Sequence, residues 1–258
     1  MILVLAGTAE GREMVAGLCA RGYQVAAATL TAYGAELAGA AGAAANINGP
    51  LSEDGLSALL QGSHFTALVD CTHPFAANIT EMAKQVCARH GLPYYRCARP
   101  AAELPVSPLI KRVDGWAGAV NAVASPVFNN IFLAIGTRHL PEFVHSPDLQ
   151  GKRLIARVLS ETDSIAFCRS LGLTPRDIIA LQGPCGRELN AALYRYYKAD
   201  IVVTKDSGTA GGMEEKVSAA LELGLPVIVI NRPREEAGMS KAEILAALKK
   251  TMGTVLIV

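Results

Sequence analysis

Three side chains with different chemistry stand together after an apolar segment, in the order Lys205, Asp206 and Ser207. A stretch rich in glycine follows, and then a segment with helical spacing that carries acidic residues in its first turn. A loop that only connects two elements seldom needs a cation, a carboxylate and a hydroxyl side by side. The pattern therefore predicts a functional loop between a strand and a helix.

His73 occupies a comparable position after an earlier apolar segment, in the run Asp70-Cys71-Thr72-His73-Pro74. Pro74 suits the first turn of a helix, so His73 is expected on a constrained turn at the strand end. The alternative is that Thr72 or His73 only caps that helix.

The first apolar segment also leads into a loop of interest, Gly7-Thr8-Ala9-Glu10-Gly11-Arg12, which opens directly into a helix. Backbone N–H groups and the helix dipole at such a position favour a phosphate. The loop departs from the G-x-G-x-x-G pattern because Ala9 stands where the second glycine would be. Taken alone, it is equally typical of simple turn geometry.

The second apolar segment ends without the acidic residue that usually binds the ribose of NAD. Thr29, Thr31 and Tyr33 stand there instead, and their hydroxyls could donate to a 2′-phosphate. No arginine accompanies them. The expected cofactor is therefore NADPH, with NADH left open.

Cations recur after other apolar segments. Arg96 and Arg99 follow one of them, and Arg232 and Arg234 follow another. Guanidinium groups suit carboxylates and phosphates, so the predicted ligand is anionic. The loops at 134–138 and 182–190 add further glycines, which turn geometry alone could explain.

Short apolar runs alternate with segments of helical spacing, a pattern that is typical of parallel strands covered by helices. The predicted fold class is α/β, with two Rossmann-like doubly wound domains of mainly parallel strands and a ligand cleft between them. A break at 125–130 divides an N-terminal domain, 1–127, from a C-terminal domain, 128–258. The pattern assigns the last helix and the last strand to neither domain.

The predicted strands are 2–6, 24–28, 46–47, 67–70, 94–95, 109–113, 131–135, 153–158, 177–181, 200–204, 227–230 and 254–258. The predicted helices begin near residues 9, 35, 52, 75, 116, 140, 162, 187, 212 and 240.

The composition argues against several classes of protein. The chain has 258 residues, of which 51% are apolar, and a formal net charge of +1. It lacks the basic excess of a protein that binds nucleic acid or anionic lipid. Gly7 and Glu10 interrupt the first apolar run before it reaches the length of a signal peptide or membrane span. We expect a cytoplasmic protein with reduced cysteines and no nucleic-acid or membrane partner. The oligomeric state stays open.

Two pairs of residues superficially resemble zinc ligands, Cys71-x-His73 and Cys87-x2-His90. A helix over 75–87 would separate them by about 18 Å, at 1.5 Å per residue. The pairs would then lie at opposite ends of that helix, so no metal site is expected.

Taken in order, these strand-end motifs resemble the precorrin-6A reductase family of cobalamin biosynthesis. The matching pieces are Ala6-Gly7-Thr8-x-Glu10-Gly11-Arg12, Asp70-x-Thr72-His73-Pro74-Phe75-Ala76, Pro93-Tyr94-x-Arg96-x-x-Arg99-Pro100, Gly183-Pro184-x-x-x-Glu188-x-Asn190 and Thr204-Lys205-Asp206-Ser207-Gly208-x-x-Gly211-Gly212-x-x-Glu215-Lys216. The second and the last are the most specific. Cys185 departs from the pattern, since an aromatic or bulky apolar residue is expected there.

The resemblance implies a reductase that uses a reduced nicotinamide cofactor to saturate one double bond of precorrin-6A, a macrocycle edged with carboxylates. Within that hypothesis the cofactor-binding residues are Gly7, Thr8, Glu10, Gly11, Arg12, Thr29, Thr31, Thr72, Gly208, Gly211 and Gly212. The substrate-binding residues are Arg96, Arg99, Lys205 and Ser207. The candidates for proton delivery or for polarising a ring nitrogen are His73, Lys205 and Asp206, with water as an alternative proton donor. Whether the ring carries cobalt stays open.

Two other classes of protein fit part of the pattern. One is a non-catalytic two-domain module that closes around an anionic small molecule by a hinge near 125–130. The other is a different nucleotide-using α/β enzyme, such as a glycosyltransferase, although no metal-binding D-x-D triplet is present.

Overall fold

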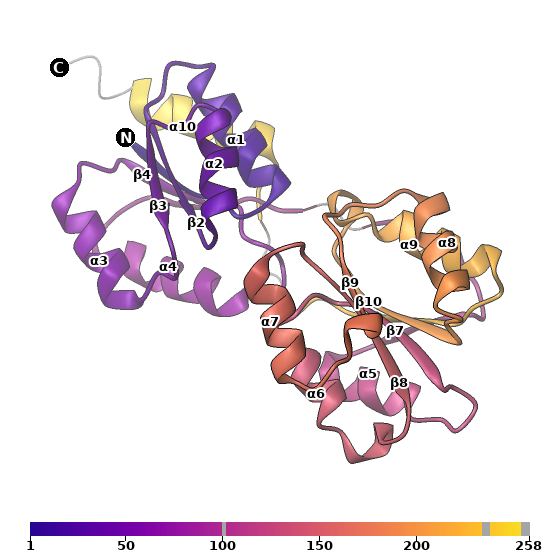
Figure 1. Cartoon of the computed structure of the whole chain (residues 1–258). Coiled ribbons are helices and arrows are strands. Elements are labelled where there is room, and N and C mark those ends of the chain that lie inside the picture. The colour runs from indigo at the N-terminus through magenta and orange to yellow at the C-terminus, as the bar shows by residue number, and fades with distance from the viewer. Residues whose placement is uncertain (100–101, 234–237, 254–258) are drawn as a thin grey trace. The chain divides into compact units, whose positions relative to one another are not determined.

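The computed structural model describes residues 1–99, 102–233 and 238–253, and the chain divides into two units (Figure 1). Unit 1 comprises residues 1–99 and 234–258, and unit 2 comprises residues 100–233. Each unit contains one sheet, and all the paired strands run parallel. The predicted α/β class with two doubly wound parallel sheets is confirmed.

Unit 1 has the sheet order β3-β2-β1-β4-β5. Its strands are β1 (Ile2–Leu5), β2 (Val25–Thr29), β3 (Ala45–Asn48), β4 (Ala67–Asp70) and β5 (Tyr94–Arg96). Its helices are α1 (Ala9–Cys19), α2 (Ala32–Ala40), α3 (Glu53–Gly62), α4 (Ala77–Arg89) and α10 (Lys241–Gly253). The strand order reverses between β1 and β4, and ligands of such sheets bind beyond the strand ends at that switch point.

Successive residues of the unit 1 strands face two different cores, as the period of a strand requires. Ile2 and Val4 of β1 face the core that α1 covers, while Leu3 and Leu5 face the core that α3 and α4 cover. Because both faces of β1, β2 and β4 are buried, these strands read as nearly continuous apolar runs rather than alternating ones.

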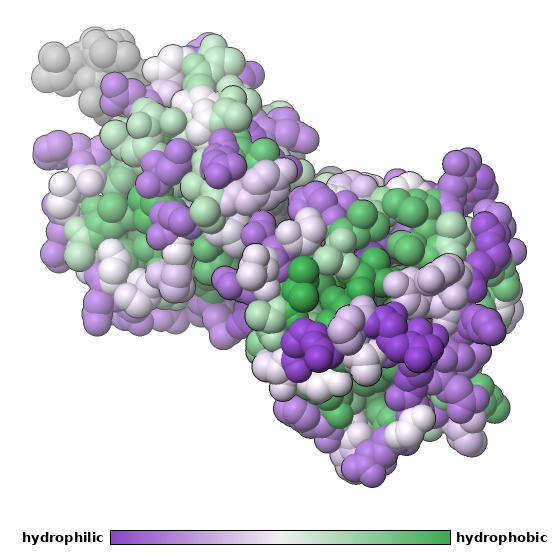
Figure 2. All heavy atoms as spheres, viewed as in Figure 1, coloured by the Kyte–Doolittle hydropathy of each residue, from purple (hydrophilic) through white to green (hydrophobic). Residues whose placement is uncertain are grey.

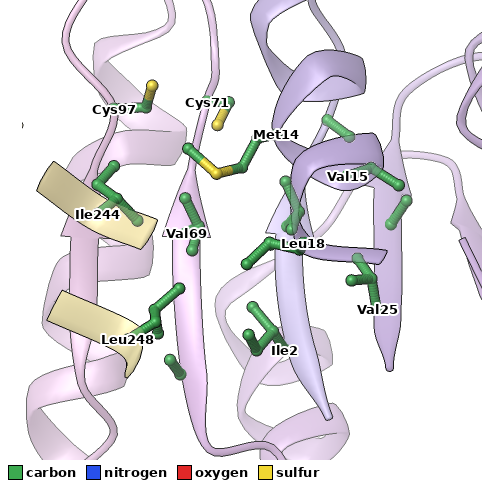
Figure 3. Close-up of a cluster of buried hydrophobic side chains, with 14 of the residues drawn as sticks. Ile2, Met14, Val15, Leu18, Val25, Val69, Cys71, Cys97, Ile244 and Leu248 are labelled. Atoms are coloured by element: carbon green, nitrogen blue, oxygen red, sulfur yellow. The ribbon is translucent and has the colours of Figure 1, made fainter. Parts of the chain in front are cut away.

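The last helix, which the sequence pattern assigned to neither domain, belongs to unit 1. Ile244, Leu245 and Leu248 of α10 are buried in the same core as Ile2 and Val69 (Figure 3). Burial of these aliphatic side chains holds α10 against the sheet. The predicted last strand, 254–258, lies outside the described residues.

Unit 2 has the sheet order β6-β11-β10-β7-β8-β9. Its strands are β6 (Ile110–Val113), β7 (Asn130–Ala134), β8 (Arg153–Val158), β9 (Ile178–Ala180), β10 (Ile201–Lys205) and β11 (Val227–Ile230). Its helices are α5 (Gly115–Val123), α6 (Leu140–Val144), α7 (Thr162–Ser170), α8 (Arg187–Tyr196) and α9 (Met213–Glu222), with short 3₁₀ turns at Pro147–Leu149, Pro175–Asp177 and Thr209–Gly211. The strand order reverses between β7 and β10.

The chain divides elsewhere than at 127/128. The strand β6 pairs with β11, from Ile110 beside Val227 to Val113 beside Ile230, so it belongs to the second sheet. The break at 125–130 is a connection between α5 and β7 inside unit 2. The chain enters unit 2 after Arg99 and leaves it after Pro233.

No helix within the described residues is long and apolar enough to cross a membrane. On the face seen in Figure 2, hydrophilic and apolar residues are interspersed over both units. All six cysteines are free thiols.

Candidate active site

The loop between β1 and α1 joins the two sides of the switch point in unit 1. Thr8 caps α1 by accepting a hydrogen bond from the N–H of Gly11 (3.1 Å), and its own hydroxyl donates to the carbonyl of Cys71 after β4 (2.7 Å). A Cβ atom at Gly11 would lie 2.6 Å from the Cα of Ala6, so only glycine lets the helix approach the strand this closely.

Gly7, in contrast, is exposed, and a Cβ atom there would meet nothing within 4 Å. The loop therefore presents open backbone at the N-terminus of an eleven-residue helix. That arrangement fits the phosphate of a nucleotide cofactor, because the helix dipole favours negative charge at this end.

Asp70 is the centre of the hydrogen bonding on the other side of the switch point. Its carboxylate is fully buried and accepts from the N–H of Thr72 (2.9 Å), the hydroxyl of Tyr94 (2.8 Å) and the guanidinium of Arg96 (3.0 Å). Burial, and then the neighbouring carboxylate, raise the pKa of Tyr94, so its phenol remains a donor.

Arg96 holds the turn that carries His73 in place by hydrogen bonds to its backbone. Besides its ion pair with Asp70, Nη1 donates to the carbonyls of Asp70 (3.3 Å) and Thr72 (3.0 Å) and to the Thr72 hydroxyl (3.1 Å). Arg99 forms a second ion pair, with Glu10 on α1, at 2.5 and 2.6 Å. Only 12% of the Arg96 side chain and 8% of the Arg99 side chain are exposed. The two arginines predicted to bind substrate are therefore partly neutralised within unit 1.

His73 lies on a tight turn after β4. Its Nδ1 accepts a hydrogen bond from the N–H of Phe75 (3.1 Å), and its carbonyl accepts from the N–H of Ala76 (2.8 Å). With Nδ1 acting as acceptor, the neutral imidazole carries its proton on Nε2. Because this turn precedes the helix, α4 begins at Ala77 rather than near residue 75 as predicted.

The hydroxyls expected to bind a 2′-phosphate already have local partners. Thr31 caps α2 by accepting from the N–H of Gly34 (3.0 Å), and Thr29 donates to the carbonyl of Thr31 (3.2 Å). Tyr33 is exposed beside them, and Arg12 is half-buried in α1. These contacts fix the turn between β2 and α2.

Asp206 follows β10 at the switch point of unit 2. Its carboxylate is buried and accepts from Arg112 of β6 (3.1 Å) and from Arg232 after β11 (3.3 Å). Asp206, one of the predicted catalytic residues, therefore links the ends of β6, β10 and β11 through these two arginines. Lys205, at the end of β10, is half-buried.

Ser207 is buried beside the glycines of the same loop. Its hydroxyl donates to the carbonyl of Gly211 (3.3 Å), and a Cβ atom at Gly211 would lie 2.2 Å from that hydroxyl. The glycine at 211 is therefore required for the serine to occupy this position. Gly208 and Gly212 complete the loop before α9.

Lys216 is the group that the sequence interpretation missed. It lies in the apolar stripe of α9 with Met213, Val217 and Ala220, and only 6% of the residue is exposed. Its Nζ donates to the hydroxyl of Ser207 (3.3 Å). A lysine within an apolar stripe at helical spacing is a signal that could have revealed it.

In unit 2, the ring of His139 also stacks on Trp116 at 3.8 Å and pairs with Glu142 at 2.8 Å. His139 follows β7, so this stack lies on the other side of the unit 2 switch point from Lys205. Trp116 is the only tryptophan of the chain, so its fluorescence can report ligand binding near the loop after β7.

No group of three or more His, Cys, Asp or Glu side chains in residues 1–99, 102–233 and 238–253 could hold a metal ion. Cys71 lies at the end of β4, whereas Cys87 lies in the last turns of α4.

Comparison with known proteins places these motifs in one family. The family model "Precorrin-6x reductase CbiJ/CobK" matches residues 1–249. The cobalt-precorrin-6A reductase of Methanothermobacter thermautotrophicus is 37% identical over 90% of this chain and 76% of that protein, and the one of Priestia megaterium is 35% identical over 92% of each. The solved structure of "CobK precorrin-6A reductase" superposes with a TM-score of 0.75 at 26% identity, covering 97% of this chain and 96% of that chain. The chain therefore belongs to the precorrin-6A reductase family.

Proposed function

We propose that the protein catalyses a step of cobalamin biosynthesis, the reduction of precorrin-6A or cobalt-precorrin-6A to the 6B form. The observation that carries the proposal is the extent of the similarity. The family model spans both units, including the loops that follow β1, β4, β7 and β10 at the two switch points. Relatives named as reductases cover nine tenths of the chain.

The cofactor is a reduced nicotinamide, which supplies the hydride when bound. The open backbone at Gly7 and the capped N-terminus of α1 support a phosphate site in unit 1. We propose NADPH over NADH, since β2 ends at Thr29 without an acidic residue to hold the ribose hydroxyls.

The substrate carries carboxylates, and we assign their recognition first to Lys205. Ser207, the other residue of this loop expected to bind substrate, is engaged instead by Lys216 and Gly211. Arg96 and Arg99 are proposed as positioning residues, because Asp70 and Glu10 already engage their guanidinium groups. In this role Arg96 holds the turn after β4 and Arg99 holds α1, and neither binds the macrocycle directly.

His73 is proposed to face the macrocycle with Nε2–H, since Nδ1 accepts from the backbone of Phe75. A donor held in this way could bind a carboxylate or polarise a ring nitrogen. Asp206 is proposed to set the conformation of the loop through Arg112 and Arg232 rather than to transfer a proton itself.

The test is a reduction assay with the purified full chain. Precorrin-6A and cobalt-precorrin-6A are each mixed with NADPH or NADH, and oxidation is followed at the nicotinamide absorbance band. Binding of each ring is measured separately by quenching of the Trp116 fluorescence. Cofactor oxidation that requires the macrocycle supports the reductase. The combination of ring and cofactor with the highest rate identifies the natural substrate and cofactor. Quenching without oxidation under every pairing would indicate a binding module and would overturn the proposal.

A matched pair of variants tests the assignment of unit 2. Lys205→Met should raise the KM for the macrocycle or lower turnover while leaving cofactor affinity unchanged. Lys111→Met removes an exposed lysine of β6 and should behave as the wild type. Equal rates for the Lys205 variant and the wild type would reject the role of Lys205.

A further inference from the structure

Lys216 is a buried amine in the apolar stripe of α9. Its Nζ donates to the Ser207 hydroxyl, and none of the ion pairs formed within the described parts of the chain includes it. Burying a charge that forms no direct ion pair is unfavourable, so an apolar side chain in this stripe would stabilise the fold better. A group that reduces stability in this way is commonly kept for function.

The titratable groups that act on Lys216 come from β8, β10, α9 and the segment before α8. Arg157 of β8 and Lys205 of β10 add positive charge, while Glu215 of α9 and Cys185 before α8 oppose them. Burial first, and then the two cations, lower the pKa of Lys216 to about 7. The amine therefore changes its charge close to neutral pH. Tyr194 of α8 contributes a neutral contact, a hydrogen bond from its hydroxyl to the carbonyl of Lys216 (3.4 Å).

The neighbouring cation is fixed in place. The guanidinium of Arg157 donates to Oδ1 of Asn190 (2.6 Å), and the amide of Asn190 donates to the carbonyls of Cys185 and Gly186. Asn190 is fully buried. Arg157 thus remains near Lys216 instead of turning away into solvent.

Ser207 connects this buried amine to the loop at the switch point. The hydroxyl accepts from Lys216 and donates to the carbonyl of Gly211, and the absence of a side chain at Gly211 gives it room. A hydroxyl that can both accept and donate is able to pass a proton between an amine and a ligand in the loop.

We propose that Lys216 is a positioning residue that supplies the proton of the reduction through the hydroxyl of Ser207. This inference rests on the proposed reductase function. One carbon of the reduced double bond receives the hydride, and the electron pair of that bond forms a C–H bond at the other carbon with the proton of Ser207. The Ser207 oxygen takes a proton from the Lys216 ammonium, and the neutral amine is protonated again by water.

The first test measures turnover against pH in the wild type, Lys216→Met and Ser207→Ala. Wild-type turnover should fall as pH rises through about 7, because the neutral amine has no proton to give. Both variants should be slower at pH 6, by roughly 100-fold, and should lack this transition, with the KM for the cofactor unchanged. Variants that retain the wild-type transition would overturn the proposal, even if they are slower at every pH.

The second test needs neither substrate nor cofactor. Lysine side chains are labelled with ¹³C at Cε and titrated by NMR in the full chain. One lysine should titrate near pH 7 in the wild type and be missing from Lys216→Met, whereas Lys111→Met should retain it. Lysines that all titrate above pH 9 would reject the proposal. A wild type that shows the titrating lysine but never oxidises the cofactor would instead overturn the proposed function.

Discussion

Replacing Lys216 by methionine should stabilise the protein at neutral pH. Methionine has a similar length and carries no charge, so it fits an apolar stripe that contains Met213 and Val217. The pKa of Lys216 is about 7 in the fold, against 10.5 for an ordinary lysine. Between these two values the unfolded chain binds the proton and the folded chain does not.

The sign of the pH effect follows from this difference. Wild-type stability rises with pH between about 7 and 10.5, and the unfavourable burial of charge is fully present below pH 7. The total difference corresponds to on the order of 5 kcal/mol, at about 1.4 kcal/mol for each pH unit. Between pH 7 and pH 9 the wild type should gain roughly 2 kcal/mol relative to the variant.

The assay is urea unfolding of the wild type, Lys216→Met and Lys111→Met at several pH values from 6 to 9. The Lys216 variant should be the most stable at pH 6, and its advantage should shrink steadily toward pH 9. The Lys111 variant should stay within about 0.5 kcal/mol of the wild type, since Lys111 is exposed. Parallel curves for the wild type and Lys216→Met would show that the buried amine does not titrate near neutrality and would refute the reasoning.

Three further changes test unit 1. Asp70→Asn leaves Arg96 without its buried partner and should lower the free energy of unfolding by about 3–5 kcal/mol, measured by urea unfolding. An unchanged unfolding midpoint would contradict that ion pair. Gly11→Ala forces a Cβ atom against Ala6 and should destabilise the fold by several kcal/mol, seen as a lower thermal midpoint. In Gly7→Ala the added methyl group meets no protein atom within 4 Å, so the variant should fold normally. The methyl group would occupy the space proposed for the phosphate, so NADPH binding, measured by calorimetry, should weaken. Unweakened binding would argue against a phosphate at this loop.

The strands were the most predictable part of the fold. The bounds of β4 (Ala67–Asp70), β8 (Arg153–Val158) and β11 (Val227–Ile230) match the prediction, because a strand buried on both faces reads as an unbroken apolar run between polar or turn residues. Helix starts depended on their caps. Thr8 and Ser52 place α1 and α3 to within one residue of the prediction.

The division of the chain could not be predicted in the same way. An apolar run indicates a strand but not its partner, and β6 follows the unit 1 strands in sequence while pairing with β11. The proline and asparagines at 125–130 mark a turn, and a turn inside a unit has the same composition as a linker.

The positions of the site residues were more predictable than their contacts. That Arg96 and Asp206 lie at strand ends follows from the sequence pattern. That Arg96 meets Asp70 depends on the register of β4 and β5, where these two residues are direct neighbours. The sequence does not encode that register locally, so a cation at a strand end cannot be told from a cation already paired.

The reduction should transfer a hydride directly from the cofactor to the corrin precursor. The most direct measurement uses NADPH deuterated at both C4 positions, with the reduced macrocycle examined by mass spectrometry after reaction in ordinary water. Each reduced ring should carry one deuterium. A reduced ring without deuterium, or labelled cofactor that stays unoxidised in the presence of precorrin-6A and cobalt-precorrin-6A, would contradict it.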